Sequence, residues 1–307
     1  MKRNTNKAKK ILEDGGLVIF PTETVYGIGC NATNLQAIKR LYKIKKRPAN
    51  NPLICHFSDI NYIKKNFKLN KIAYQLADKF WPGPLTIILK KKEDTKIHPM
   101  LSNNTKFVGC RIPKHPLAQK LLKKLNFPIA APSANISNKL SSTNTSHLKD
   151  FFDENIYILD GGGKSFYGLE STVVDIRNNK IKILRLGSIT FEQIKMLIPN
   201  VVISHNYSKL SPGQKQKHYS PNLPLRINVN SVLEGEALLN FGKNNLKSKT
   251  KELNLSLTEN LEEASNNFYD YLHKLDNTKS IGIAVAPIPN KNLGKTINDR
   301  LFRASSN

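Results

Sequence analysis

The sequence is poor in cysteine and offers no cysteine pair. Its 307 residues include three cysteines, Cys30, Cys55 and Cys110, which are widely spaced and form no Cys-x-x-Cys motif. An odd number of scattered cysteines argues against a disulfide framework and against a structural zinc site. No apolar run reaches the roughly 18 residues that a membrane-spanning helix needs. We therefore expect a cytoplasmic protein in a reducing environment, with no membrane contact.

The usual nucleotide-binding fingerprints are missing as well. The sequence contains neither Gly-x-Gly-x-x-Gly nor Gly-x-x-x-x-Gly-Lys-Ser/Thr, so it indicates neither a dinucleotide-binding loop nor a Walker loop. The three glycines at residues 161–163 are weak evidence for phosphate binding on their own. No spacing typical of metal ligands appears either. We therefore predict no metal-binding residue.

Acidic residues are scarce. The chain has 23 Asp and Glu against 48 Lys and Arg, which gives a formal net charge of +25 and favours polyanionic partners such as ATP or RNA. Only nine of the basic residues are arginine, and lysine, asparagine and isoleucine are abundant throughout, which indicates a compositional bias. An arginine that occurs despite this bias indicates a site that needs a planar guanidinium, which can donate two hydrogen bonds to one ligand. Arg47, Arg111 and Arg185 stand out for this reason.

Helix and strand patterns alternate over most of the chain. Apolar periodicity and breakers predict helices at residues 5–14, 35–44, 60–67 and 71–80, and a further helix opened by Pro116. The same signals predict strands at residues 17–20, 53–57, 85–89, 107–112, 129–131, 157–159, 172–176 and 181–186. The last two strands should form a hairpin around Asn178 and Asn179. Because crossover and hairpin signals both occur, we expect an α/β fold with a twisted, open, mixed β-sheet.

A polar stretch at residues 204–222 interrupts this alternation. It separates a predicted catalytic domain, residues 1–203, from a predicted small C-terminal domain, residues 223–307. The stretch is rich in side chains that can bind phosphates and bases, so we expect a lid as well as a linker. Beyond it, strands at 237–241 and 281–286, a helix at 261–275 and a closing helix after Thr296 predict a small, Rossmann-like α/β domain.

A basic loop at residues 44–56 carries the strongest chemical signal. Pro48 and Pro52 fix the backbone and keep a helix from running through the loop, which leads into a predicted strand. The loop presents Lys45, Arg47 and Asn51, which are the donors that a polyphosphate needs. A solvated basic turn is the alternative interpretation.

Hydroxyl, amide and guanidinium groups recur where the predicted strands end. Ligands bind at the carboxyl ends of strands in α/β sheets, so these side chains should share one basic, concave cavity. The hydroxyls are Thr22, Thr24, Ser133 and Ser171, and the amides are Asn51 and Asn135. No nucleophile is evident. Such a cavity would hold two reactants in line and neutralise developing charge, which is how most phosphoryl and nucleotidyl transfer is catalysed.

Six ordered motifs resemble a known family. They are Pro-Thr-Glu-Thr-Val-Tyr-Gly at 21–27, Lys-Lys-Arg at 45–47 with Asn-Pro-Leu at 51–53, Trp-Pro-Gly-Pro at 81–84, Ala-Pro-Ser-Ala-Asn at 131–135, Leu-Glu-Ser-Thr at 169–172, and Ser-Pro-Gly to His-Tyr at 211–219. Over nearly the whole chain, they resemble the two-domain long form of the YrdC-type threonylcarbamoyl-AMP synthases. The resemblance implies a YrdC-like catalytic domain.

The resemblance also implies an activity. L-threonine, bicarbonate and ATP would give L-threonylcarbamoyl adenylate and pyrophosphate, with Mg²⁺ carried on the phosphates. This would be the first step toward N6-threonylcarbamoyladenosine in tRNAs that read codons beginning with A. A downstream tRNA-modifying transferase complex would use the adenylate, and a direct contact with tRNA is left open.

Residue roles follow from the matched positions. The resemblance implies that L-threonine is bound by Thr24, His56, Arg111, Ala131 and Ser171. It implies that ATP is bound by Arg47, Asn51, Ser133, Asn135, Ser141, Arg185 and Tyr219. Lys45 and Arg47, from the Lys-x-Arg signature, would be the catalytic pair.

Several alternatives stay open at this stage. His56 lies in an apolar strand and could be an ordinary core histidine, Thr24 could be a turn cap, and Ala131 could simply need to be small. Phe107 replaces a threonine common in the family, and Gln214 replaces a methionine. The rival functions are a non-catalytic module that binds double-stranded RNA or tRNA, and carbamoyl transfer to another acceptor.

Overall fold

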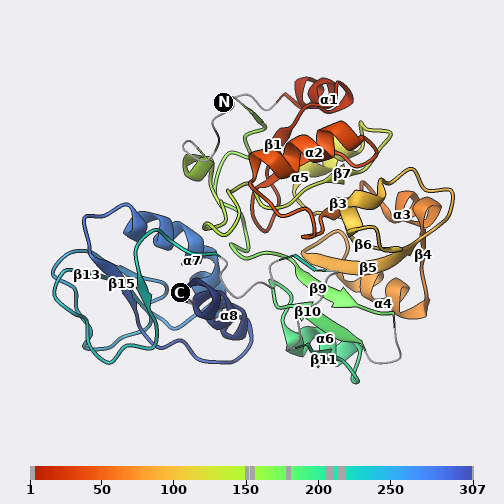
Figure 1. Cartoon of the computed structure of the whole chain (residues 1–307). Helices are drawn as coiled ribbons and strands as arrows, with labels where there is room; N and C mark the ends of the chain where they lie inside the picture. The colour runs from red at the N-terminus through yellow and green to blue at the C-terminus, as the bar shows by residue number, and fades with distance from the viewer. Residues whose placement is uncertain are drawn as a thin grey trace.

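The computed structural model describes residues 4–148, 152, 156–177, 181–204, 211–212 and 219–305. Two β-sheets organise these residues, one of eleven strands and one of four. Figure 1 shows the smaller sheet with its helices, in blue, beside the larger unit. The larger sheet combines parallel and antiparallel neighbours, as in β3–β6 and β5–β6, so the predicted mixed sheet is confirmed.

The larger sheet has the strand order β11-β10-β9-β5-β6-β3-β7-β2-β1-β8, with β4 beside β5. Its strands are β1 (Val18–Phe20), β2 (Gly27–Asn31), β3 (Ile54–His56), β4 (Phe67–Lys68), β5 (Leu85–Lys91), β6 (Phe107–Arg111), β7 (Ile129–Ala130), β8 (Tyr157–Ile158), β9 (Thr172–Asp175), β10 (Lys182–Arg185) and β11 (Val202–Ile203). The predicted pairing of β9 with β10 is antiparallel as expected, although its turn at 178–180 lies outside the described residues.

Asparagine and aspartate side chains begin most of the helices beside this sheet. Asn4, Asn34, Asp59 and Asn70 each accept hydrogen bonds from backbone N–H groups in the first turn of the helix that follows. The helices are α1 (Thr5–Glu13), α2 (Leu35–Ile44), α3 (Ile60–Asn66), α4 (Lys71–Phe80), α5 (Pro116–Leu122) and α6 (Phe191–Leu197), with short 3-10 turns η1 (Pro99–Ser102) and η2 (Thr145–Leu148). Local capping therefore fixes where these helices start.

Apolar side chains cover both faces of β1. Ile19 joins the large core cluster that includes residues of α2 and α4, whereas Val18 and Phe20 join a second cluster with α1 and α5. Successive side chains of a strand point to opposite faces, so the continuous apolar run predicted for β1 reflects burial on both sides. The strand is held rigidly and delivers the Thr22–Thr24 loop at its end.

The smaller sheet is entirely parallel. Its order is β12-β15-β13-β14, in agreement with the predicted Rossmann-like unit. Its elements are β12 (Leu225–Arg226), β13 (Glu236–Asn240), β14 (Glu252–Asn254), β15 (Gly282–Val285), α7 (Leu261–Asp276) and α8 (Leu293–Ser305). Val25, Leu140 and Leu169 of the larger unit belong to the same apolar cluster as the core of the smaller one. The two units are therefore packed together.

Some predictions differ from the structure. Strand β2 was not predicted, because two of its five residues are glycines, which weaken a strand signal. Gly29 is required there, since a Cβ atom would lie 2.4 Å from the side chain of Ile129. Helix α6 was also missed, and α8 begins at Leu293 instead of after Thr296.

The predicted domain boundaries at residues 203 and 222 fall between β11 and β12 and stay a proposal. Most of the predicted linker, including Gln214 and His218, lies outside the described residues. Within the described part, no helix is long and apolar enough to cross a membrane.

Candidate functional site

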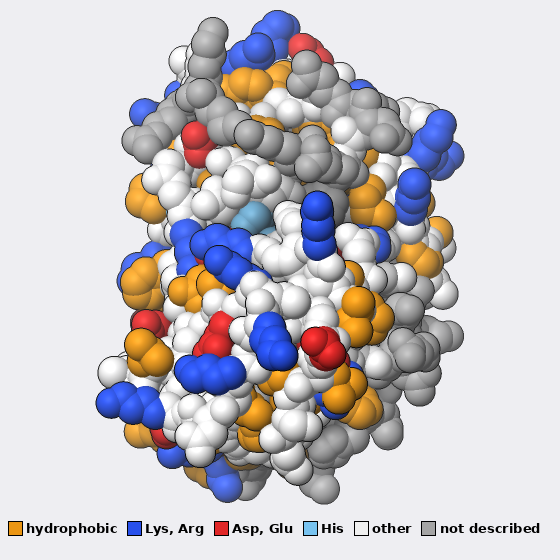
Figure 2. Space-filling model, turned by 90° about the vertical axis from the view of Figure 1, so that its left-hand side faces the viewer, with side chains coloured by type: hydrophobic (Ala, Val, Ile, Leu, Met, Phe, Trp, Pro, Cys, Tyr) orange, Lys and Arg blue, Asp and Glu red, His pale blue; other side chains and the backbone are white. Residues whose placement is uncertain are grey.

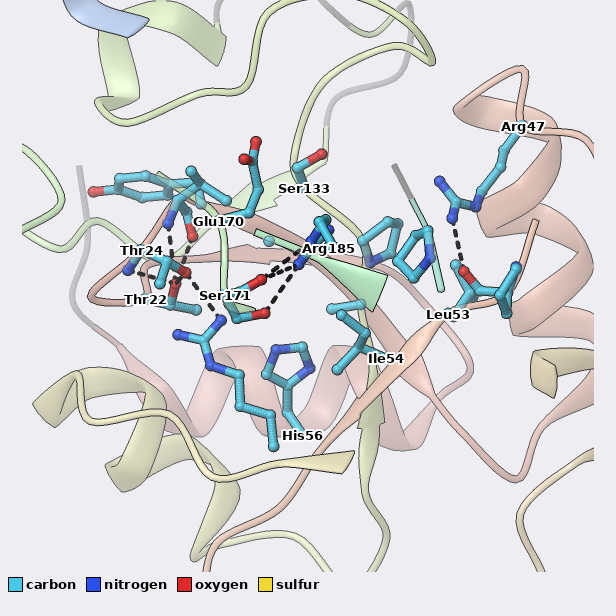
Figure 3. A pocket seen from close by; sticks show the side chains of 18 of the residues that line it. Thr22, Thr24, Arg47, Leu53, Ile54, His56, Ser133, Glu170, Ser171 and Arg185 are labelled. Carbon is cyan, nitrogen blue, oxygen red and sulfur yellow. Dashed lines mark hydrogen bonds between the residues drawn. The ribbon is translucent and has the colours of Figure 1, made fainter. Parts of the chain in front are cut away.

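A cavity of about 50 Å³ opens where the loop after β1, the ends of β3 and β6, the loop after β7 and the segment before β9 meet. Of the predicted site residues, it is lined by Thr24, Arg47, His56, Arg111, Ala131, Ser133, Ser171, Arg185 and Tyr219. Figure 3 shows Thr22 and Thr24 at one end and Arg47 at the other, with Ser171 and Arg185 between them. Residues far apart in the sequence thus share one site.

The basic loop places Arg47 at one end of the cavity. Helix α2 ends at Ile44, and Arg47 Nη2 then donates to Asn51 Oδ1 and to the Pro52 carbonyl, at 2.7 Å each. Arg47 Nε also donates to the Asn51 carbonyl, at 3.1 Å. Burial lowers the pKa of Arg47 to about 10, so the guanidinium is charged at neutral pH. Every one of these partners is neutral, so the positive charge is oriented without being cancelled.

Arg185, at the end of β10, holds Ser171 in the middle of the cavity. Its Nη2 donates to the carbonyl and to Oγ of Ser171, at 2.8 and 3.0 Å. Ser171 Oγ also shares a 2.8 Å hydrogen bond with Thr86 Oγ1 from β5. Burial lowers the pKa of Arg185. Two strands and the segment before β9 therefore fix one hydroxyl and one guanidinium in the cavity wall.

Arg111, at the end of β6, has a charged partner at the opposite end. Its Nη2 lies 2.6 Å from Glu23 Oε1, both side chains are almost fully buried, and Nη1 donates to Thr24 Oγ1 at 2.9 Å. Thr22 Oγ1 shares a 2.8 Å hydrogen bond with Thr24 Oγ1 and donates to the Val25 carbonyl at 2.6 Å, which closes a tight turn. Thr24 therefore belongs to the cavity wall as well as to a turn.

His56 lines the cavity, although it lies in an apolar strand. Its ring contacts Phe20 edge to face, with centroids 5.9 Å apart, and Nδ1 has no hydrogen-bond partner among the described residues. Burial, and then the charge of Arg111, lower the pKa of His56 to about 3, so the ring is neutral at physiological pH. An ordinary core histidine would have both nitrogens satisfied, so the unpartnered Nδ1 favours a ligand-binding role, and the assignment of His56 to threonine stays a prediction.

Ala131 and Gly27 leave room at the centre of the site. Ala131 is 3% exposed, and its backbone N–H donates to the Ile54 carbonyl at 2.9 Å. A Cβ atom on Gly27 would lie 3.5 Å from the Ala131 Cβ atom. Larger side chains at either position would fill the cavity.

Four predicted residues lie behind the cavity wall. Lys45 donates from Nζ to the carbonyls of Ser133 and Asn135, and burial, with the charge of Arg47, lowers its pKa well below the usual value. Asn51 orients Arg47, Asn135 Nδ2 donates to two carbonyls of its own loop, and Ser141 donates to Glu170. In this structure, these side chains position the residues that line the site.

Sequence reasoning missed two carboxylates. Glu170 lines the cavity, and Glu23 pairs with Arg111 just behind it. Both lie within motifs that were recognised, but a cationic pocket gave no reason to assign them. Phe107 does not line the cavity. The guanidinium carbon of Arg177 lies 4.9 Å from the centre of the Phe107 ring, so the side chain at this position packs against Arg177.

The described part of the chain contains no cluster of three or more His, Cys, Asp or Glu side chains that could hold a metal ion. The three cysteines are buried and not bonded to one another. On the face in Figure 2, Lys and Arg are dispersed among acidic and hydrophobic side chains, in keeping with a compositional origin of the net charge.

Comparisons with known proteins agree with the motifs and the fold. Residues 10–187 match the family model described as "Telomere recombination", and residues 189–306 match "Threonylcarbamoyl-AMP synthase, C-terminal domain". The chain is 34% identical to the threonylcarbamoyl-AMP synthase of Bacillus subtilis (strain 168), covering 97% of this chain and 92% of the relative. It is also 34% identical to that of Pyrococcus abyssi, covering 97% and 93%.

A solved structure is similar over the same length. The crystal structure of P. abyssi Sua5 complexed with L-threonine superposes with a TM-score of 0.89 at 32% identity, covering 98% of this chain and 94% of that one. Both halves of the chain are matched in order, and the cavity contains residues from five of the six motifs, including Pro212 and Tyr219 of the last one. The chain therefore belongs to the threonylcarbamoyl-AMP synthase family.

Proposed function

We propose that this chain is an enzyme that combines L-threonine, bicarbonate and ATP into L-threonylcarbamoyl adenylate and pyrophosphate. The observation that carries the proposal is the convergence of Arg47, Arg111 and Arg185 in one buried cavity of a chain that matches such synthases from end to end. The reaction class is nucleotidyl transfer, because the adenylyl group moves from pyrophosphate to a carbamate oxygen.

ATP is proposed to bind at the end of the cavity that holds Arg47. Arg47 and Arg185 would face the phosphates, and Asn51 keeps the guanidinium of Arg47 in a fixed orientation. Ser133 and Tyr219, which also line the cavity, would contact the nucleotide. Guanidinium groups that are buried and already oriented stabilise phosphate charge more strongly than mobile surface lysines.

L-threonine is proposed to bind at the other end. Arg111 would hold its carboxylate, with Thr24 and Ser171 as hydroxyl partners and neutral His56 beside them. The small side chain of Ala131 leaves space for the substrate. The P. abyssi protein solved with L-threonine shows that a relative accepts this amino acid.

The chemical step needs no nucleophilic side chain. The amine of threonine forms a carbamate with bicarbonate and releases water, and a carbamate oxygen then attacks the α-phosphorus of ATP. The bond to the β-phosphate oxygen breaks, and pyrophosphate leaves with the negative charge. The protein holds the reactants in line and stabilises that charge. The role of Lys45 in catalysis stays a prediction, since its Nζ atom supports the Ser133–Asn135 loop here.

Mg²⁺ is proposed to enter with ATP, as part of the substrate. Glu170 is the carboxylate among the described lining residues, but its oxygens already accept hydrogen bonds from Ser141, Tyr269 and Arg300. The described residues therefore do not fit a protein-held metal, and the ligands of Mg²⁺ would be phosphate oxygens and water.

The product is a reactive mixed anhydride. We propose that a tRNA-modifying transferase complex consumes it to form N6-threonylcarbamoyladenosine in tRNAs that read codons beginning with A. The buried, unbonded cysteines support a reducing, cytoplasmic location.

Pyrophosphate release from ATP, measured with and without threonine and bicarbonate, tests the proposal. We expect release only when both are present, together with intact threonylcarbamoyl adenylate detected by mass spectrometry. Release that is independent of threonine would indicate carbamoyl transfer to another acceptor. No release, together with tight RNA binding, would indicate a non-catalytic module and contradict the proposal.

A further inference from the structure

Glu170 is held from both units of the protein. Its side chain is buried, and Oε1 accepts hydrogen bonds from Ser141 Oγ at 2.6 Å and from the Tyr269 hydroxyl at 2.8 Å. Its Oε2 accepts from Arg300 Nε at 2.9 Å. Tyr269 lies on α7 and Arg300 on α8, both in the small unit. A carboxylate in the cavity wall is therefore fixed by side chains from the C-terminal part of the chain.

The guanidinium of Arg300 reaches two further parts of the cavity wall. The side chain has no exposed surface, and Nη2 donates to the Leu186 carbonyl at 2.6 Å, directly after Arg185. The guanidinium carbon lies 4.7 Å from the centre of the Tyr219 ring, which is within the range of a cation–π contact. One cation of α8 thus touches Glu170, the residue after Arg185, and the ring of Tyr219.

The charges explain why this contact matters for the site. Burial alone would raise the pKa of Glu170, but the charges of Arg300 and then Arg185 hold it at about 2, so the carboxylate is ionised. A buried carboxylate that loses one cation must find another partner. Among the described residues, Arg185 is the second cation that acts on Glu170, and without Arg300 an ion pair between Glu170 and Arg185 would remove a positive charge from the cavity.

We propose that Arg300 is a positioning residue for ATP binding: it keeps the Glu170 carboxylate away from Arg185 and supports the Tyr219 ring in the cavity wall. This inference rests on the proposed function, because it concerns the phosphate end of the same site. It also means that side chains of the small unit support the wall of the nucleotide site.

Two alanine variants of α8 separate this role from simple attachment of the two units. Arg300→Ala removes the contacts with Glu170 and Tyr219. Lys295→Ala is the matched control, because Lys295 Nζ also binds a residue of the larger unit, Glu192 Oε1 at 2.6 Å, but neither of these two residues lines the cavity. We expect Arg300→Ala to raise the KM for ATP about tenfold and to leave the KM for threonine within about twofold. Lys295→Ala should leave both within about twofold.

A double variant tests the charge argument itself. In Arg300→Ala with Glu170→Gln, the neutral amide cannot pair with Arg185, so the double variant should bind ATP more tightly than Arg300→Ala alone. If Arg300 only joined the two units, the second substitution would bring no recovery. ATP affinity is measured directly by calorimetry as well as from kinetics.

Tyr269→Phe keeps the test decisive if Arg300→Ala does not fold. It removes one hydrogen bond to Glu170 and leaves the ring in place, so we expect a rise of about threefold in the dissociation constant for ATP. Thermal unfolding of every variant reports its stability. Unchanged ATP affinity in folded Arg300→Ala and Tyr269→Phe, or an equal loss in Lys295→Ala, would overturn the inference. A wild-type protein that binds ATP but forms no adenylate would contradict the proposed function and leave this inference standing.

Discussion

The two ends of the cavity hold their arginines in opposite electrical settings. At one end, Arg111 is paired with a carboxylate, with 2.6 Å between Nη2 and Glu23 Oε1. Toward the other end, Arg47 and Arg185 donate hydrogen bonds to neutral carbonyl, amide and hydroxyl oxygens. Figure 3 places Thr24, the neighbour of Glu23, at the end opposite to Arg47.

The difference shows how the same residue type serves two ligands. Where the guanidinium has a carboxylate beside it, the end of the site is close to neutral and suits a ligand with both charges, such as an amino acid. Where its partners are neutral, the positive charge is retained and suits a polyphosphate. The partner of each arginine, more than the arginine itself, therefore distinguishes the two ends.

Removing the positive charge at the phosphate end should have the largest effect. We expect Arg47→Ala to lower kcat/KM for ATP at least about a hundredfold, or about 2–3 kcal/mol, because one of the two guanidiniums proposed to face the phosphates is lost from a buried cavity. Lys43→Ala removes an exposed charge from α2, the helix that precedes the basic loop, and should change little. Steady-state pyrophosphate release measures both variants. Near-normal turnover of a folded Arg47→Ala protein would remove the phosphate role from the basic loop.

Tyr219 should come next. The ring is 2% exposed and lines the cavity, so Tyr219→Ala should weaken ATP binding about thirtyfold, as expected for a lost stacking contact. We also expect more hydrolysis of the adenylate, because the site admits water. Tyr219→Phe keeps the ring over Arg300 and is the control. Equal yields of intact adenylate from Tyr219→Ala and the wild type would show that the predicted linker, residues 204–222, only connects the two units.

A smaller effect is expected at the amino-acid end. Arg111→Lys keeps the charge beside Glu23 but loses the two-pronged geometry, so the KM for threonine should rise about tenfold while the KM for ATP stays within about twofold. The informative quantity is the change in the KM for threonine relative to the change in the KM for ATP. An unchanged KM for threonine would assign Arg111 a structural role, and the contrast between the two ends would then not reflect their ligands.

His56 sharpens the contrast through pH. Its pKa is about 3 in the folded protein, against 6.5 as the ordinary value. Below pH 6.5, His56 therefore binds a proton in the unfolded chain but not in the folded chain. This difference lowers the free energy of unfolding as the pH falls toward 3. We expect the urea midpoint of His56→Gln to fall less steeply than that of the wild type between pH 6.5 and 4. If the urea midpoints of the two proteins fall equally with pH, the His56 ring is not held neutral in the folded protein.

Local signals predicted the secondary structure well. Helices at 35–44 and 71–80 begin and end as expected, because Asn34 and Asn70 cap their first turns and the loops after them contain prolines. The sequence also placed Thr24, Arg111 and Ser171 at strand ends, and all three line the cavity. Ion-pair partners were not predictable, because Glu170 and Arg300 are 130 positions apart and no periodicity connects them.

The direction of each side chain was the other feature that could not be predicted from the sequence. Lys45 and Arg47 are two positions apart in one loop, yet Arg47 lines the cavity and Lys45 turns to the carbonyls behind it. Which of two neighbouring cations faces a ligand depends on the backbone at the helix end, where Lys46 has a positive φ of 51°. Residue type alone carries no information about that angle.

The uncancelled charge of Arg47 and Arg185 has a consequence for the protein without its nucleotide. Burial is the main cause of the lowered pKa of Arg47, and the like charge of Arg185 adds to it, because two guanidiniums in one cavity repel each other. A polyphosphate between them would relieve this repulsion, so ATP should raise the unfolding temperature by more than an uncharged nucleoside does. The folded population of the protein would then follow the supply of its own substrate.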